Sequence, residues 1–410
     1  MNSMVSRLHA IPRWLMLAFA CLGLISCGGG GGGGGGGGSA AKEVAECFQF
    51  VSGYTWGSVR SADIKLGGET ASNAKIQVIA DPAVPAAPNA CSSTGPGLNT
   101  VQTLGANGTI GLSNFAQDCG QSCASQTQNG FYYACAGSSC SPIAVALANQ
   151  LWNPVALFAT DNNGTILSLP AVSSAGATQV SGILTFGIGT QANNGVGSAT
   201  VVNVDPNNAE FTAAVGATSY PGSFIDSGSN GLFYGSNLFP LCNGAFSEFY
   251  CPPSPQAQNG FLDPSGVNLP VNFTVSNPQA LAAAITADAE LAAPGFGGVD
   301  WGLPLFFGRS IYTSIQGMST PAGSGAWLGI TSGSVSSGGT NQVPVVVDAG
   351  PPGANVINSA YVSVTLCAPG STTNCQTIDH LQVDTGASGV RVLASALQPA
   401  LLAALPQSTP

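Results

Sequence analysis

Phe224 to Tyr234 read Phe-Ile-Asp-Ser-Gly-Ser-Asn-Gly-Leu-Phe-Tyr, which places an aspartate between a hydrophobic pair and a Ser-Gly turn. The chain repeats this pattern. Ile225 to Leu232 align without gaps on Val383 to Val390, so hydrophobe, Asp, Ser or Thr, Gly, two small residues, Gly and hydrophobe recur in register. One such turn is a weak signal, because many turns use Asp. Two copies in one frame, each after a strand-like run, indicate a site assembled from both.

Chemistry gives the repeated aspartates a reason. Two carboxyl groups held face to face cannot both ionise, so Asp226 and Asp384 would share a proton. One would act as general base on a water while the other, protonated, polarises a carbonyl. The alternative is a pair of Asp residues that only stabilise turns. We expect Asp226 and Asp384 to be catalytic, supported by the residues that follow them: Ser227, Gly228, Ser229, Thr385, Gly386 and Ser388.

The repeat resembles the catalytic motifs of the pepsin-like aspartic peptidases, and more specifically those of the pepsin-like lipoproteins of Gram-negative bacteria. In that family a later signature, two hydrophobes and a Gly, threads beside each catalytic loop. Leu305 to Gly308 match the signature that belongs with Asp226, and Gly108 to Leu112 resemble the one that belongs with Asp384. The resemblance covers nearly all of residues 40 to 393. It implies a mainly β, bilobal acid-protease fold with a cleft between two β lobes.

Other segments extend this resemblance. Gly53 to Gly68 resemble the flap hairpin and its following strand, with Tyr54 or Trp56 as the residue that covers substrate; ordinary packing is the alternative for both. Pro142 to Trp152 resemble the helix after the first-lobe signature, and Ile183 to Gly187 the strand that closes that lobe.

Two residues depart from the family pattern. Ala387 stands where many relatives have Ser or Thr, so one outer hydrogen bond to Asp384 is expected to be lost, and Asn230 is a second departure. Both weaken the expectation of high activity without removing the aspartates.

The order of the segments differs from that of the family, in which the first Asp-Thr-Gly precedes the flap. The order is restored if the segment from about Asn341 to Pro410 is moved in front of Ala40, so we interpret the chain as circularly permuted. Gly323 to Gly339, rich in Gly and Ser, would then link the old ends. An engineered or misassembled reading frame and a coincidence of motifs are the alternatives. The expected parts are a signal peptide (1–26), a lipidated Cys and poly-Gly tether (27–39), first-lobe parts (40–195 and 336–410, the latter with Asp384) and a second lobe (196–335).

The N-terminus has the pattern of a secretory signal. Arg7 and Arg13 precede an apolar run too short to span a membrane. Cys27 follows Leu-Ile-Ser, which resembles a bacterial lipobox, so we expect Cys27 to be lipidated; a plain signal is the alternative. Gly28 to Gly38 form a run of eleven glycines, a flexible tether with a reach of roughly 15 to 20 Å. Gly28 directly after Cys27 favours sorting to the outer membrane.

The composition of the chain without its expected signal limits the kinds of partner and of fold that it can have. Without the signal, six basic residues stand against 18 acidic ones, a formal charge of −12, which argues against nucleic acid as a partner. Short apolar runs between turn residues predict a mainly β fold with short helices. The clearest predicted helix is Pro278 to Ala293, capped by Asn277 and stopped by Pro294.

Cysteine and histidine counts constrain the chemistry further. Ten cysteines remain after Cys21 and Cys27, and an even number in an exported chain predicts disulfides. Connectivity does not follow from sequence, although Cys242 with Cys251 and Cys367 with Cys375 are the local pairs we favour. A metal site is disfavoured, because the mature chain has one histidine, His380, and the Cys spacings are not those of zinc sites. His380 is more consistent with a structural role than with a Ser-His-Asp or Cys-His site.

We therefore expect a lipid-anchored aspartic endopeptidase that acts on peptides or proteins, works without metal or organic cofactor and is a monomer. The rival is a catalytically weak or inactive pepsin-like module that binds an envelope partner. A glycoside hydrolase that uses carboxylates is a third reading, but the sequence offers no second acid in a distinct environment.

Overall fold

The computed structural model describes residues 42–410 except 129, 264, 296 and 334–337. The expected signal peptide, Cys27 and the run of glycines lie outside the described residues. Strands account for 42% of the structure and helices for 10%, which confirms the predicted mainly β class. Within the described residues, no helix is both long and apolar enough to cross a membrane.

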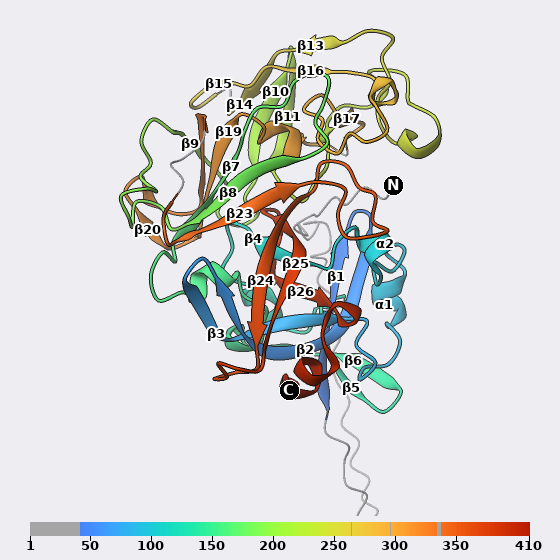
Figure 1. Cartoon of the computed structure of the whole chain (residues 1–410), viewed down its shortest axis with the longest axis vertical. Coiled ribbons are helices and arrows are strands. Elements are labelled where there is room, and N and C mark those ends of the chain that lie inside the picture. Colours follow the sequence, from blue (N-terminus) through green and yellow to red (C-terminus); the bar gives the residue numbers. More distant parts are fainter. Residues whose placement is uncertain (1–41, 129, 264, 296, 334–337) are drawn as a thin grey trace, which may run out of the picture.

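Six strands close into a barrel, which lies low in Figure 1. The ring closes because the strand that contains Asp63 to Lys65 pairs with the strand that contains Thr365 to Cys367. Strands from both ends of the sequence alternate around it, so blue and red segments lie side by side in the figure. In order around the ring they are β2 (Gly53–Leu66), β3 (Glu69–Ile79), β26 (Ser388–Leu393), β4 (Gly108–Leu112), β25 (Cys375–Asp384) and β24 (Ala360–Cys367).

The barrel belongs to a 15-stranded sheet that continues on two sides. Beyond β2 lie β1 (Glu43–Phe50), β5 (Tyr132–Ala136) and β6 (Ser139–Pro142). Beyond β24 lies a layer of six antiparallel strands, made of β23 (Gln342–Val347), β8 (Val180–Phe186), β7 (Gly164–Leu169), β19 (Arg309–Ser314), β22 (Trp327–Ser332) and β9 (Thr200–Asn203). The strand predicted at Ile183 to Gly187 is therefore confirmed up to Phe186, where β8 ends.

The strand β22 corrects one prediction. The segment Gly323 to Gly339 was expected to be a linker, but Trp327 to Ser332 pair with both β19 and β9. Its Trp-Leu-Gly-Ile run is buried, and burial of those apolar side chains outweighs the flexibility that the flanking Gly and Ser residues suggest.

A seven-stranded sheet lies at the top of Figure 1. Its order is β15 (Leu269–Pro270), β14 (Gly260–Leu262), β10 (Phe211–Val215), β11 (Thr218–Ile225), β18 (Asp300–Trp301), β12 (Leu232–Phe233) and β17 (Ala292–Ala293). Two small pairs complete the strands, β13 (Gln256–Gln258) with β16 (Phe273–Val275) and β20 (Ser319–Thr320) with β21 (Gly323–Ser324).

The helices are short, as predicted. The α-helices are α1 (Asn89–Ser92), α2 (Val101–Leu104), α3 (Gln121–Ser125) and α4 (Pro399–Ala404). The 3₁₀ turns are η1 (Leu147–Asn149), η2 (Pro154–Leu157), η3 (Gly244–Phe246), η4 (Pro278–Ala280), η5 (Leu303–Leu305) and η6 (Ala394–Ala396).

Two predicted helices are wrong. Pro278 to Ala293 starts as expected, with the Asn277 side chain accepting from the N–H of Gln279, but it ends after one 3₁₀ turn. Further along the segment, the N–H groups of Thr286 and Ala287 both donate to the Ala177 carbonyl instead of to carbonyls of a helix. Tertiary hydrogen bonds thus override the helix propensity of the alanines. Pro142 to Trp152 holds only η1, because Val145 bonds back to Cys123.

One hydrophobic core joins the barrel to the seven-stranded sheet. It includes Ile76 and Val390 of the barrel, and Ile225 and Trp301 of the upper sheet, each at most 5% exposed. Full burial of each such side chain contributes on the order of 1.5 to 3 kcal/mol. The repeated Asp motifs therefore lie at the ends of strands that are fixed in a common core.

The ten predicted cysteines form five disulfides in the described structure. The favoured pairs, Cys242 with Cys251 and Cys367 with Cys375, are both confirmed. The remaining pairs are Cys47 with Cys91, Cys119 with Cys123 and Cys135 with Cys140.

Candidate active site

Asp384 is the last residue of a strand that runs parallel to its neighbour. β25 pairs with β4, and β4 in turn pairs antiparallel with β26, the strand that leaves the Asp384 loop. A Cβ on Gly111 would lie 2.6 Å from the carbonyl carbon of Ser388. Gly111 is therefore needed for β4 to thread this closely past the loop.

Asp226 has the same surroundings in the upper sheet. β11 runs parallel to β18, and β18 pairs antiparallel with β12, which leaves the Asp226 loop. The Asp226 N–H donates to the Trp301 carbonyl at 3.2 Å. A Cβ on Gly302 would lie 2.2 Å from the Gly231 carbonyl oxygen. The two loops are thus built by one strand-loop-strand arrangement with a third strand threaded between.

This geometry corrects the assignment of the second signature. Leu305 to Gly308 were expected to thread beside Asp226, but Trp301 and Gly302 do so. Leu305 ends η5, and Gly308 leads into β19. The error arose because Trp301 and Gly302 are preceded by the acidic Asp300 instead of a second hydrophobe.

The two carboxyl groups lie side by side. The Gly386 N–H is 2.9 Å from Oδ1 of Asp384 and 3.2 Å from Oδ1 of Asp226. The Gly228 N–H also donates to Asp226 Oδ1, at 2.7 Å. Asp226 is 0% and Asp384 2% exposed. We call Asp226 and Asp384 the carboxyl pair, and the structure brings together both predicted residues and both glycines.

Ser227 and Thr385 hold the two loops together reciprocally. The Ser227 N–H donates to Thr385 Oγ1 at 2.9 Å, and the Thr385 N–H donates to Ser227 Oγ at 3.1 Å. Ser227 Oγ also donates to the Val383 carbonyl at 2.7 Å. These contacts cross between loops 158 residues apart in sequence, so each loop fixes the position of the other.

Ser229 lies between two carboxyl groups. Its hydroxyl is 2.9 Å from Asp226 Oδ2 and 2.7 Å from Oδ2 of Asp300, which is 5% exposed. Sequence reasoning found Ser229 but missed Asp300. The signal available was an acidic residue directly before Trp301-Gly302, in a chain with only 6% charged residues.

Ser388, the predicted counterpart on the other loop, makes different contacts. Its hydroxyl lies 2.6 Å from the Ser113 hydroxyl and 2.7 Å from the Phe115 carbonyl oxygen. It ties the Asp384 loop to the segment after β4, while Ala387 offers no hydroxyl at the position of Ser229.

The predicted flap residues pack away from the carboxyl pair. The Trp56 indole donates to the Pro85 carbonyl at 2.7 Å and meets the Tyr133 ring. Tyr54 packs against the same cluster, which surrounds the Cys47–Cys91 disulfide. Both line a cavity of about 330 Å³ under residues 80–87.

Two other aromatic residues of the same hairpin reach the catalytic loop. Phe48 and Phe50, at the end of β1, share a cluster with Ala387. Their spacing, two residues apart on one strand face, was the sequence signal that could have identified them.

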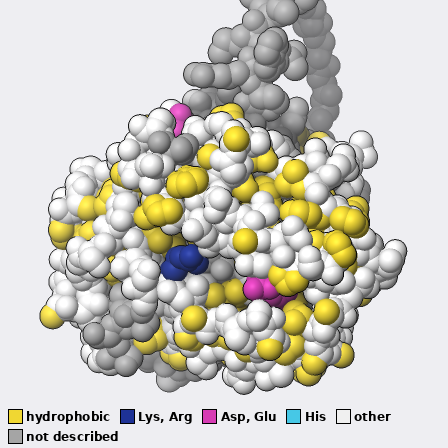
Figure 2. Space-filling view, turned by 90° about the horizontal axis from the view of Figure 1, so that it is seen from above, with side chains coloured by type: hydrophobic (Ala, Val, Ile, Leu, Met, Phe, Trp, Pro, Cys, Tyr) yellow, Lys and Arg dark blue, Asp and Glu magenta, His cyan; other side chains and the backbone are white. Residues whose placement is uncertain are grey.

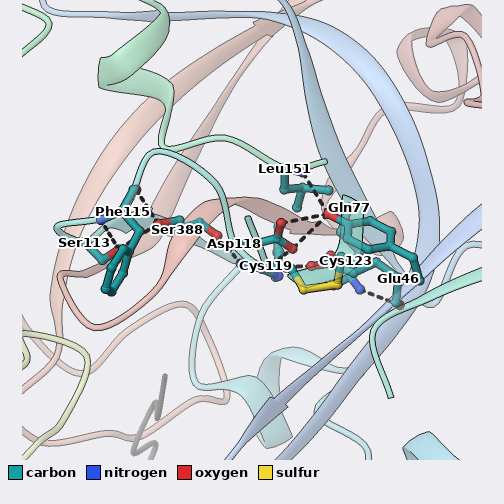
Figure 3. A network of polar contacts seen from close by, with 11 residues as sticks. Glu46, Gln77, Ser113, Phe115, Asp118, Cys119, Cys123, Leu151 and Ser388 are labelled. Carbon is teal, nitrogen blue, oxygen red and sulfur yellow. Dashed lines mark hydrogen bonds and ion pairs between the residues drawn. A yellow bond between two sulfur atoms is a disulfide. The ribbon is translucent and has the colours of Figure 1, made fainter. Parts of the chain in front are cut away.

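A buried polar network stands behind the Asp384 loop (Figure 3). Arg391, 0% exposed, donates to the Ser388 carbonyl at 2.8 Å and pairs with Glu46 at 2.5 Å. Its guanidinium also lies 3.6 Å from the centre of the Phe48 ring. Figure 3 shows Asp118 and Glu46 on one side of this region and Ser388 with its partners on the other. The network connects the Asp384 loop to β1.

Asp118 adds a second acid to this network. Its Oδ2 lies 3.5 Å from Arg391, and its oxygens accept from the Tyr132 hydroxyl at 2.8 and 2.9 Å. Burial raises the pKa of Asp118 well above its ordinary value, and the negative charge of Glu46 raises it further. Arg391 therefore forms an ion pair with Glu46, while burial and Glu46 both favour the protonated form of Asp118.

A second buried acid stands behind the Asp226 loop. The Asn358 side chain donates to the carbonyls of Asn230, at 2.9 Å, and Asp288, at 2.7 Å. Asp288 is 2% exposed, and burial raises its pKa to about 6.

His380 lies outside the carboxyl pair. Its ring is 3.3 Å from Asp348 and 3.2 Å from Asp379, and it meets the Tyr361 ring. These contacts fit the structural role expected for it. Within the residues that the structure covers, no three His, Cys, Asp or Glu side chains are grouped to hold a metal ion.

The molecular face above the upper sheet carries few charged side chains, as Figure 2 shows. Hydrophobic side chains, the backbone and other side chains without charge cover most of what the figure draws in colour or white. Such a face is consistent with the low content of charged residues in the chain.

Comparison with known proteins identifies a family. No curated protein and no solved structure matches the chain. One family model, described as Protein of unknown function (DUF3443), matches residues 36–329 and 337–410. Because these residues make up most of the chain, it belongs to the DUF3443 family.

Proposed function

We propose that this protein is an aspartic endopeptidase that hydrolyses peptide bonds through a water held between Asp226 and Asp384. The ionised carboxylate takes a proton from the water as its oxygen attacks the peptide carbonyl. The protonated carboxyl donates to the carbonyl oxygen. The resulting tetrahedral intermediate collapses with proton transfer to the leaving amine. No metal or organic cofactor is needed.

One observation carries this proposal: a single N–H, that of Gly386, lies within hydrogen-bond reach of both carboxyl groups. Two carboxyl groups this close, in a buried site, favour a shared proton, because two adjacent negative charges repel each other. A pair of Asp residues that only stabilised turns would have no need to face each other across two loops.

We infer a pepsin-like fold of two lobes, with the barrel in one and the seven-stranded sheet in the other. The matched arrangement of strands around Asp226 and Asp384 supports this internal repeat.

We also infer that the order of the segments is a circular permutation. In a permuted chain, the beginning and the end of the folded part should lie next to each other. They do so here, since the Val44 N–H donates to the Ser408 carbonyl at 2.8 Å. One family model matches both residues 36–329 and residues 337–410, which favours a natural chain over an assembly error.

We further propose export and anchoring at the outer membrane through lipidated Cys27, with the tether leading to β1. The five disulfides support an oxidising compartment. The partners are then a peptide or protein substrate and the membrane, with no nucleic acid, and the protein acts as a monomer.

The test is cleavage of a mixed peptide library from pH 3 to 7 by the wild type and by Asp226→Asn and Asp384→Asn. Both variants should lose at least about 1,000-fold in rate, because the dyad acts as a unit. Asp379→Asn is the matched control: its carboxylate is 66% exposed on the same strand as Asp384, and it should cleave like wild type. Cleavage that persists in either dyad variant would refute the mechanism.

The rival function is a tethered binding module with the pepsin-like fold. The near-complete burial of Asp226 and Asp384 favours it, because a substrate must reach these oxygens. A folded wild type that cleaves no peptide at any pH, yet retains labelled peptides on a column, would establish this alternative.

A further inference from the structure

The Ser229 hydroxyl stands between Asp226 and Asp300, a contact that the proposed mechanism does not use. The distances, 2.9 Å to Asp226 Oδ2 and 2.7 Å to Asp300 Oδ2, both lie within the normal range of O–H···O hydrogen bonds. All three residues are buried, with Ser229 and Asp226 at 0% and Asp300 at 5% exposure.

The two hydrogen bonds of the Ser229 hydroxyl need two hydrogens, and Ser229 supplies only one of them. A hydroxyl has one hydrogen to donate, and an ionised carboxylate only accepts. If both acids were ionised, one of these short contacts would join two acceptors beside two negative charges, which is unfavourable in a buried site. One acid must therefore be neutral and donate to Ser229 Oγ, and the Ser229 hydrogen then points to the other.

The backbone decides which acid is ionised. Asp226 Oδ1 accepts from the N–H groups of Gly228, at 2.7 Å, and Gly386, at 3.2 Å. Hydrogen bonds from N–H groups stabilise the charged form of a carboxyl. These N–H groups favour the negative charge on Asp226, which leaves the proton for Asp300.

We propose that Asp300 is a neutral positioning residue that donates to Ser229 and so directs the Ser229 hydroxyl to Asp226, which makes Asp226 the general base and Asp384 the acid. This inference rests on the proposed function. Ala387, at the position that matches Ser229, has no hydroxyl to donate to Asp384. Only the charged form of Asp226 is therefore stabilised in this way. Asp300 keeps its proton throughout the reaction, while Asp226 accepts the proton of the water and Asp384 gives up its own.

The test reads protonation directly, without substrate. The full chain, labelled with ¹³C at aspartate Cγ, is titrated by NMR from pH 3 to 8. The resonances are assigned by their loss in Asp226→Asn, Asp300→Asn and Asp384→Asn. At pH 5, Asp300 should resonate as a carboxylic acid and Asp226 as a carboxylate. An ionised Asp300, or a protonated Asp226, at that pH would overturn the proposal.

Variants separate this role from simple packing. Asp300→Asn should leave the titration of Asp226 unchanged, because its amide N–H donates to Ser229 as the acid does. Asp300→Ala and Ser229→Ala should both make Asp226 take up its proton at higher pH. If Asp300→Asn shifts the titration of Asp226 as much as Asp300→Ala does, the neutral-donor role is wrong. If the Asp300 variants do not fold, Ser229→Ala alone decides, since an unchanged Asp226 titration would overturn the proposal.

These outcomes are independent of turnover. Absence of cleavage by the wild type would reject the peptidase, and the NMR titration would still show whether Asp300 is neutral. A charged Asp300 in an enzyme that cleaves peptides would reject the positioning role alone.

Discussion

The Asp226 and Asp384 loops share one backbone design and differ in what supports it. Three residues after the aspartates stand Ser229 and Ala387, and seven residues after them stand Phe233 and Arg391. Phe233 packs in an apolar cluster with Phe249, whereas Arg391 forms a buried ion pair.

The difference separates two kinds of position. Ser227 and Thr385, which reach across to the other loop, are matched because the N–H of each donates to the hydroxyl of the other. Phe233 and Arg391 instead contact residues outside the two loops. These positions can differ, because an aromatic ring and an ion pair can each fill a buried site. One loop is thus supported by buried charges and the other by an apolar cluster, and the following variants test this difference.

Arg391→Met should have the largest effect on the free energy of unfolding. It leaves Glu46 buried without its cation, which costs about 3 to 5 kcal/mol. Phe233→Leu, at the matched position, should cost only about 1 kcal/mol, because the cluster loses part of a ring and no charge is exposed to an apolar site. Urea unfolding at pH 7 measures both.

The double variant Glu46→Gln/Arg391→Met is the control for the charge. It should be clearly more stable than Arg391→Met, because no isolated charge remains. Equal losses for Phe233→Leu and Arg391→Met would show that the ion pair does not distinguish the two loops.

The buried acids behind the loops predict how stability changes with pH. The pKa of Asp288 is raised to about 6 in the fold, from 3.8. The folded state then binds more protons than the unfolded state between these values, so stability falls as the pH rises from about 4 to 7, by up to about 3 kcal/mol. Asp288→Asn should remove this part of the fall. Urea unfolding at pH 4 and pH 7 measures the difference.

Asp118 provides the comparison on the other loop. Its pKa is also raised, first by burial and then by Glu46, so Asp118→Asn should likewise flatten the loss of stability towards high pH. A slope identical to that of wild type in Asp288→Asn would contradict the effect of burial.

The sequence allowed the carboxyl pair to be predicted because the required residues are contiguous in each copy. Asp226, Ser227 and Gly228 form one local pattern, and only their pairing with the second copy had to be inferred. The mainly β class followed in the same way from short apolar runs and turns.

The parts that could not be predicted depend on contacts between distant segments. Asp300 lies 71 residues from Ser229, and Glu46 lies 345 residues from Arg391. Neither acid belongs to a local motif. The helix prediction at Pro278 to Ala293 was wrong for the same reason, because the N–H groups of Thr286 and Ala287 donate to the distant Ala177 carbonyl.

Thr385→Val tests the reciprocal contact between the loops. The Ser227 N–H is buried and would lose its acceptor, which costs about 1 to 3 kcal/mol. Thr385→Ser keeps the hydroxyl and should lose well under 1 kcal/mol. Thermal unfolding measures both, and a larger loss in Thr385→Ser than in Thr385→Val would show that the methyl group, and not the hydrogen bond, holds the loops together.

Ala387→Ser should have the smallest effect and is the sharpest test of the asymmetry. It places a hydroxyl on the Asp384 loop where Ser229 stands on the other, at a site that is 1% exposed. A hydroxyl that donates to Asp384 stabilises its charged form, so Asp384 should release its proton at lower pH than in wild type, while stability changes by about 1 kcal/mol or less. ¹³C NMR of the aspartate carboxyls measures the shift, with Ala387→Gly as the control that adds no hydroxyl. An unchanged Asp384 titration would mean that the bias between the two acids comes from the backbone N–H groups alone, because the second hydroxyl would then have no influence on where the proton resides.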